Sequence, residues 1–306
     1  MSIVIVNPSS ASGSTGEAWP QMASDLRSHF GAFRVVFTNQ RGDAAALASE
    51  AARKGAKLII ACGGDGTISE VANGILSSGK DVELGILPSG TGGDFRRTLE
   101  IPSRTRDAAR ILRTGRTARI DVGRVSYLDH NGNDAMRYFV GVTSCGMSTK
   151  VIERVKGDGA SFASALLKTA MRNEPVRLVV QLDDSHERHL VVSNLCVANA
   201  RYFGGGMKIA PDAKLTDGKF DVVGVGDLSA MKIFTSAPRV YTGSHLSMPE
   251  VSHALARKII VKPADRTAEV ALEVDGELPG RLPATFQIIP EALRVRINDQ
   301  LLGTDR

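Results

Sequence analysis

Two aspartates lie in glycine-rich turns that follow apolar segments. Asp65 lies in CGGDGTISEV at positions 62–71, and Asp94 lies in GILPSGTGGDF at positions 85–95. Glycines keep side chains away from a ligand, and the unpaired N–H groups of a first helical turn attract phosphate. A bare carboxylate would repel that phosphate unless Mg²⁺ lies between them or the carboxylate takes a proton from an attacking hydroxyl. The two turns therefore indicate a site that could hold one nucleotide and one metal ion.

Local patterns limit this interpretation. Thr67 and Glu70 form a T-x-x-E pattern, which predicts a capping box at the start of a helix directly behind the first turn. The structural alternative is a tight turn in which Asp65 bonds only to local backbone amides. No GxxxxGK[ST] motif occurs, and GDGTIS lacks the third glycine of the dinucleotide fingerprint, so neither a Walker A loop nor a classical Rossmann turn is predicted.

The segments around these turns alternate between strand-like and helix-like patterns. In the first third, β-branched runs are each followed by a helical stretch, which predicts a doubly wound α/β domain with a parallel sheet. Both turns then lie at the carboxyl ends of adjacent strands. After 120–125, strands follow strands, which predicts an antiparallel sandwich or barrel with helices near 161–172 and 229–243. The domain boundary is placed near residue 122.

The composition is that of a folded chain with room for two ordinary domains. Its 306 residues are 42% hydrophobic and 23% charged, without a low-complexity tract. The longest apolar runs fall far short of the roughly 20 residues of a spanning helix, and no secretory signal precedes SIVIVNP, so the expected compartment is the cytoplasm. Three cysteines without a CxxC pair are expected to be buried thiols, and six histidines show no zinc-ligand spacing.

The charge pattern leaves several partners open. A net charge of +5 fits anionic substrates, an acidic membrane surface or nucleic acid. Nucleic acid is not expected, because no basic strand is interleaved with aromatic residues. Arginines crowd positions 96–119, where Ala108 and Leu112 belong to an apolar stripe and Arg106 and Arg110 to another helical face. Such a helix could lie on anionic lipid, or it could pack on a core with a solvated basic face.

Taken together, these motifs resemble the diacylglycerol kinase catalytic-domain family, the soluble lipid kinases that include bacterial diacylglycerol kinases and sphingosine kinases. The resemblance covers essentially the whole chain, because VNPSSASGSTG, CGGDGTISEVANGIL, LPSGTGGDFRRTL, IDVGRV, YFGGGMKIAPDAKLTDGKFDVV and EVDGE occur in family order. It implies a doubly wound, NAD-kinase-like nucleotide domain at 1–122 to which 291–306 returns. It also implies an all-β antiparallel sandwich lipid domain at 123–290, with the active site between the two domains.

The resemblance implies an ATP- and Mg²⁺-dependent lipid kinase and gives roles to individual residues. Asp65, Asp94 and Glu277 would form the carboxylate cluster for Mg²⁺ and hydroxyl activation, with Glu277 the usual candidate base. The implied ATP contacts are Asn7, Thr38, Gly64, Asp65, Gly66, Thr67, Ile68, Ser69, Glu70 and Thr91. The family's structural Mg²⁺ site would match Asp217 with the backbone carbonyls of Lys214 and Lys219.

Some assignments depend on the family alone, and some positions depart from it. Without the resemblance, Asp275 and Gly276 before Glu277 read as a type I′ hairpin turn. Gly93 and Ser69 stand where the family usually has asparagine, and the first loop, SSASGST, lacks the basic residue often found there. Each departure removes one candidate ATP contact, whereas all the carboxylates are retained.

The acceptor and the partners stay open at this stage. Diacylglycerol, a sphingoid base and ceramide all fit the motifs, and the substrate is expected at a membrane surface, with the protein peripheral to the inner face. Phe162, Leu166, Leu167 and Met171 could line an apolar cleft for the lipid or could form ordinary core. An NAD kinase shares GGDGT but would carry a GNLGFLT-like segment, which is absent, and a catalytically weak lipid or nucleotide sensor is the other alternative. The oligomeric state is unspecified, with a homodimer among the options.

Overall fold

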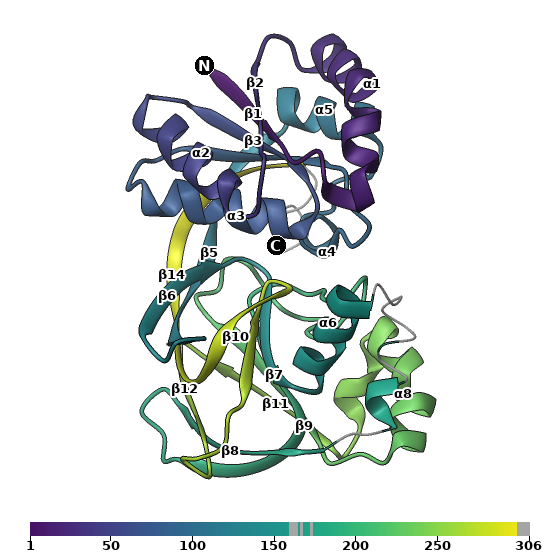
Figure 1. Ribbon diagram of the computed structural model, residues 1–306, viewed down its shortest axis with the longest axis vertical. Coiled ribbons are helices and arrows are strands. Elements are labelled where there is room, and N and C mark those ends of the chain that lie inside the picture. The colour runs from purple at the N-terminus through teal and green to yellow at the C-terminus, as the bar shows by residue number, and fades with distance from the viewer. Residues whose placement is uncertain (159–164, 166–167, 172–173, 299–306) are drawn as a thin grey trace. The chain divides into compact units, whose positions relative to one another are not determined.

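The computed structural model describes residues 1–158, 165, 168–171 and 174–298 (Figure 1). The chain divides into two compact units, one of Met1–Val122 with the segment from Pro290 onward, and one of Gly123–Ile289. Two long strands, β5 (Arg116–Asp129) and β14 (Glu277–Ile297), each run from one unit into the other.

Unit 1 is built on a sheet of parallel strands in the order β4-β3-β1-β2. Every residue of β3, LIIACG, is buried, as expected for a strand in a sheet covered on both faces. Helix α2 packs against α3 and helix α1 against α5, and Figure 1 shows these two pairs on opposite sides of the sheet. The elements are β1 (Ser2–Val6), η1 (Ser10–Gly13), α1 (Ser14–His29), β2 (Arg34–Phe37), α2 (Asp43–Arg53), β3 (Leu58–Gly63), α3 (Asp65–Ser77), β4 (Glu83–Pro88), α4 (Asp94–Thr98) and α5 (Thr105–Thr114).

The C-terminal half of β14 completes this sheet, as the predicted return of the segment requires. Val295 pairs with Leu84 of β4 in parallel. Beside that pairing, the Arg296 guanidinium donates two hydrogen bonds to the buried Glu83 carboxylate, one of them from Nη2 to Oε2 at 2.8 Å. Burial alone would raise the pKa of Glu83, but the bonds from Arg296 and Thr117 outweigh it and hold this pKa below its ordinary value.

Unit 2 is an antiparallel β structure. Its strand pairs form a closed circuit, β7-β9-β8-β12-β14-β13, because the long strands β9 and β14 each use different segments for their two partners. Strands β10 and β11 extend the sheet beyond β9, and β6 pairs with β5. The elements are β6 (Asp134–Phe139), β7 (Val142–Gly146), α6 (Met147–Asp158), β8 (Val176–Leu182), β9 (Arg188–Ala198), β10 (Phe220–Gly226), α8 (Ala230–Thr242), η2 (Ser244–Ser247), β11 (Val251–Ala256), β12 (Lys258–Pro263) and β13 (Ala271–Val274).

The core of unit 2 is centred on aromatic rings. The rings of Phe139 and Phe220 stack at 5.4 Å, and Phe286 meets Phe139 edge-on at 6.4 Å. A Cβ atom at Gly123 would lie 2.1 Å from the Phe139 ring, so only glycine admits the ring at this place. The predicted antiparallel packing of this half of the chain is therefore present.

Several helix predictions can now be judged. The helix expected at 229–243 is α8. In α5, Ala108, Ala109 and Leu112 are buried and Arg106 pairs with Asp25, so the apolar stripe packs on the core, and contact of the basic face with anionic lipid stays a prediction. No helix in the described residues is long and apolar enough to span a bilayer. The cysteines are free and buried, as predicted.

Only part of the segment 162–171, where an apolar cleft was one expectation, belongs to the described residues. Phe162, Leu166 and Leu167 lie outside the described residues. Met171 is described and is 66% exposed, so it is not a core residue, which was one of its two alternatives, and it is not enclosed as the lining of a buried cleft would be.

Candidate active site

Three loops of unit 1 meet at the carboxyl edge of its parallel sheet. The Asn7 side chain, after β1, donates to Thr67 Oγ1 at 3.1 Å in the first turn of α3. The Ser89 N–H, after β4, donates to the Gly63 carbonyl at 3.0 Å, and Thr15 Oγ1 donates to the Ser89 carbonyl at 2.7 Å. The prediction that the two glycine turns lie together is therefore confirmed, and the first loop joins them.

Glycine makes the close approach of these turns possible. A Cβ atom at Gly90 would lie 2.4 Å from Gly64 Cα, and a Cβ atom at Gly92 would lie 2.8 Å from Asp65 Oδ2. No side chain fits at such distances. Where the two turns approach each other, they therefore present backbone and the Asp65 carboxylate.

The Asp65 carboxylate joins the two turns directly. Oδ2 accepts the N–H of Asp94 and Oδ1 accepts the N–H of Phe95, both at 3.0 Å. Asp65 thereby supplies negative charge to the first turn of α4, whose first N–H groups have no partner within the helix and bond to this carboxylate instead. The alternative of purely local amide bonds is wrong, because the amides belong to the next turn along the sheet.

Two arginines accompany the two carboxylates. Arg97 Nη1 lies 2.9 Å from Asp94 Oδ1 and also donates to the Gly92 carbonyl. Burial and the neighbouring charge of Arg97 lower the pKa of Arg96, while Asp65 and Asp94 act in the opposite direction. The site thus combines backbone N–H groups, two carboxylates and two guanidinium groups, which is the chemistry that binds phosphate with a divalent cation. Both arginines lie in the motif DFRRTL, but no role in the site was predicted for them from the sequence.

In unit 2, the residues before Glu277 form the predicted hairpin turn. Asp275 and Gly276 have φ of 49° and 80°, and Val274 pairs with Glu277 across the two-residue loop. The Asp275 carboxylate accepts the N–H groups of residues 140 and 141, at 3.1 and 2.9 Å. The turn before Glu277 is therefore held by hydrogen bonds to the connection between β6 and β7.

A buried polar chain holds the other side of this turn. The Gly276 N–H donates to Glu273 Oε1 at 2.6 Å, and Ser144 Oγ donates to the second oxygen of the same buried carboxylate. Ser144 Oγ lies 2.7 Å from Ser148 Oγ, which donates to Asn194 Oδ1 at 2.8 Å. Four side chains thus connect the hairpin to the wall of a cavity.

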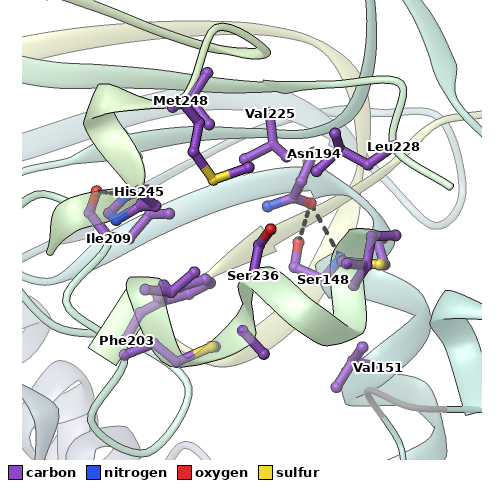
Figure 2. Close-up of a pocket in the computed structure, with 16 residues that line it drawn as sticks. Ser148, Val151, Asn194, Phe203, Ile209, Val225, Leu228, Ser236, His245 and Met248 are labelled. Atoms are coloured by element: carbon purple, nitrogen blue, oxygen red, sulfur yellow. Dashed lines mark hydrogen bonds between the residues drawn. The ribbon is translucent and has the colours of Figure 1, made fainter. Parts of the chain in front are cut away.

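That cavity has a volume of about 100 Å³ and an almost entirely apolar wall (Figure 2). Ser148 and Asn194 reach it on one side, and burial lowers the pKa of His245 on another, where its ring bonds to the Ile209 carbonyl. No sequence pattern predicted this cavity, because its lining comes from strands and helices far apart along the chain. Apolar lining residues include Val151, Phe203, Ile209, Val225, Leu228 and Met248.

Comparisons with known proteins now decide the family. The family model of the diacylglycerol kinase catalytic domain matches residues 1–125, and that of the YegS C-terminal NAD kinase beta sandwich-like domain matches residues 141–297. The chain belongs to the diacylglycerol kinase family. It is a lipid kinase.

Individual relatives agree with this assignment. A diacylglycerol kinase of Mycobacterium tuberculosis (strain H37Rv) is 30% identical to this kinase over 83% of the chain and 81% of its own length. A diacylglycerol kinase of Staphylococcus haemolyticus (strain JCSC1435) is 29% identical, over 92% and 84%. A crystal structure of a diacylglycerol kinase from Bacillus anthracis (strain Sterne) has the same fold, with a TM-score of 0.73, 22% identity and 98% coverage of each chain.

Within the kinase, some predicted nucleotide contacts have other partners. Ile68 and Ser69 are each 1% exposed and pack inside unit 1, and a contact of either residue with ATP stays a prediction. The Glu70 carboxylate accepts the N–H groups of residues 42 and 44 and so caps α2. The capping box of Thr67 and Glu70 is wrong, because α3 already begins at Asp65.

Other predicted contacts lie at or near the loop cluster. Gly64 and Gly66 flank Asp65 and are half-buried, whereas Thr91 is exposed in the second turn. Thr38 is buried, and its N–H donates to the Val6 carbonyl at the end of β1. Nucleotide binding by these residues stays a prediction.

The loop predicted to hold a structural Mg²⁺ lies close to another carboxylate, that of Asp221. The Asp217 carboxylate is exposed and accepts the Lys219 N–H at 3.0 Å. Burial raises the pKa of nearby Asp221, and Asp217 raises it further, against the lowering effect of His253. Among the described residues no three His, Cys, Asp or Glu side chains group as metal ligands. A site with Asp217 and the carbonyls of Lys214 and Lys219 stays a prediction.

Proposed function

We propose that this kinase uses ATP and Mg²⁺ to phosphorylate a hydroxyl of diacylglycerol or a related lipid alcohol. The observation that carries the proposal is the loop cluster of unit 1, where glycine turns bring Asp65 and Asp94 together beside Arg96 and Arg97. The parallel strand order with flanking helices supports a doubly wound, NAD-kinase-like nucleotide domain in this unit. The named activity of the curated relatives supports the acceptor class.

The residues present fit a nucleotide phosphate and a divalent cation. Gly64 and Gly90 approach so closely that only backbone faces a ligand there. Mg²⁺ in kinases is held by one or two carboxylates together with substrate phosphates, and Asp65 and Asp94 supply two carboxylates. When bound, the ion would neutralise charge that develops on the transferred phosphoryl group. Arg96 and Arg97 would add positive charge on the protein side.

The acceptor side uses residues of unit 2. Glu277 is the proposed general base, which accepts the proton of the lipid hydroxyl. Its hairpin is fixed by Asp275 on one side and by Glu273 on the other, so the carboxylate needs little reorganisation. The apolar cavity would take part of an acyl chain, because its wall offers almost no polar group that a hydrocarbon would leave unsatisfied.

Transfer of labelled γ-phosphate from ATP to diacylglycerol, ceramide or sphingosine in vesicles, with and without Mg²⁺, tests the proposal. Glu277→Gln should reduce turnover by about 100-fold or more, the usual contribution of a general base, without changing the melting temperature. Glu269→Gln is the matched control, because this exposed glutamate lies near Arg281 in the same unit. Equal turnover in both variants would refute the role of Glu277.

The same assay with NAD added, together with an ATP-binding titration, separates the alternatives. Phosphorylated NAD in place of phosphorylated lipid would identify an NAD kinase. Binding of ATP without any product would identify a sensor.

A further inference from the structure

Helix α8 is apolar on the face that it turns to the interior of unit 2. Ile233, Ser236, Ala237 and Val240 all line the cavity, and Figure 2 shows Ser236 on the cavity side. Their spacing of three and four residues places them on one helical face. This face accounts for the position of α8 on unit 2.

A second apolar stripe runs along α8 beside the inner face, and it is open to solvent. Met231 is 72% exposed, Phe234 61% and Tyr241 49%, and these residues follow one another at intervals of three and seven. They therefore form a single stripe along the helix. Met171, which is 66% exposed, follows Ala170, whose side chain packs in one cluster with Ile233 at the start of α8. A helix that only covered a core would carry polar residues here.

The charges around this stripe are mainly positive. Helix α8 contains Lys232 and Arg239 and no acidic residue. Lys208 lies at its C-terminal end, where its N–H donates to the Val240 carbonyl at 2.9 Å. The nearby acids are Glu250, which pairs with Lys232, and Asp227, which precedes the helix.

We propose that the outer face of α8 docks on an anionic membrane surface, with Met231, Phe234 and Tyr241 inserted among the lipids. An exposed apolar stripe on a helix that carries basic residues on another exposed side is an arrangement with which helices lie in a lipid interface. The substrate of a lipid kinase resides in a membrane, and no helix in the described part of the chain could span one. The inner face of α8 borders the apolar cavity, so one helix separates the docked lipid layer from the proposed acyl site. The inference rests on the proposed function in that a membrane lipid is the acceptor.

Co-sedimentation of the full chain with vesicles, without ATP, tests the docking surface. Vesicles of phosphatidylcholine alone are compared with vesicles that also contain phosphatidylglycerol. Phe234→Ser should bind both kinds about tenfold more weakly, because a large side chain no longer leaves water. Arg239→Gln should bind about fivefold more weakly to the anionic vesicles only. Met136→Ser and Arg266→Gln, exposed residues elsewhere on unit 2, are the controls and should bind like the wild type.

Equal vesicle binding by Phe234→Ser and wild type would overturn the proposal. So would light scattering that shows a wild-type dimer and a monomeric Phe234→Ser, because a second copy would then cover the stripe. Phosphorylation of a dissolved short-chain diacylglycerol should be unchanged in Phe234→Ser, and an equal loss on dissolved and vesicle lipid would contradict docking. Vesicle binding that depends on α8 in a chain that phosphorylates no lipid would uphold docking and refute the proposed function.

Discussion

Replacing Asp65 with asparagine tests whether one carboxylate holds the two glycine turns together. Each carboxylate oxygen accepts one backbone N–H at 3.0 Å, from Asp94 and Phe95. In asparagine one of the oxygens becomes an NH₂ group, which places a donor against a donor. The variant therefore loses one hydrogen bond, and it also loses the negative charge at the start of α4.

The size of the effect follows from these two bonds. A hydrogen bond to a charged group contributes about 1.5–3 kcal/mol net, and a charge at a helix terminus adds a few tenths of a kcal/mol. Asp65 is half-buried, so water can replace part of the lost bond. We therefore expect Asp65→Asn to lower the free energy of unfolding of unit 1 by about 2 kcal/mol, which for a unit of this size corresponds to a melting temperature lower by about 7 °C.

Thermal unfolding with amide hydrogen exchange measures both the global and the local effect. Exchange should become faster at the N–H groups of residues 94 and 95. Asp183→Asn is the matched control in unit 2, because Asp183 Oδ1 alone accepts both of its N–H partners and an amide oxygen can do the same. An Asp65→Asn variant that melts like the wild type and keeps slow exchange at these positions would refute the reasoning.

Three further outcomes are expected. Glu83→Gln should lower the free energy of unfolding by about 3 kcal/mol, because it leaves Arg296 poorly paired. The folded pKa of Glu83 is lowered, so the stability from its charge is lost as the pH falls. In urea unfolding, the difference between wild type and variant should therefore shrink below about pH 4.5. Gly93→Ala should weaken ATP binding several-fold in a fluorescence titration, because its Cβ would lie 2.6 Å from Arg96 Nε and its φ is +69°. The three cysteines should react with a thiol reagent only after unfolding, because burial raises their pKa values, those of Cys62 and Cys145 to about 12.

Sequence patterns predicted those features whose cause is local or periodic. The continuous apolar run LIIACG predicts a buried strand, and it forms β3, in which every residue is buried. Asp275 and Gly276 both need positive φ, and DG is the dipeptide that best supplies it, so the hairpin before Glu277 could be read directly. The meeting of the two glycine turns followed from strand order, because adjacent parallel strands end at one edge.

Features that depend on tertiary partners could not be read in this way. The T-x-x-E pattern at Thr67 is compatible with a capping box, but Glu70 caps a different helix that lies 26 residues away in sequence. The cavity in unit 2 is enclosed by segments from Met147 to Val251 whose own periodicity only says that they are buried. The exposed stripe of Met231, Phe234 and Tyr241 on α8 could not be predicted, because apolar residues on two sides of a helix do not reveal which side packs against the core.

Ser69 and Gly93, the two positions near the loop cluster where the family usually has asparagine, can be reconsidered from their surroundings in the folded chain. Ser69 is fully buried in α3, so an asparagine there would have to fit into packed core. At Gly93 the space for a side chain is taken by Arg96, whose charge lies near both Asp65 and Asp94. A family asparagine would bring a neutral amide to this place, whereas this chain brings a guanidinium, which binds phosphate more strongly. The first loop lacks the basic residue often found in the family, but Arg96 places positive charge beside the two carboxylates of the loop cluster.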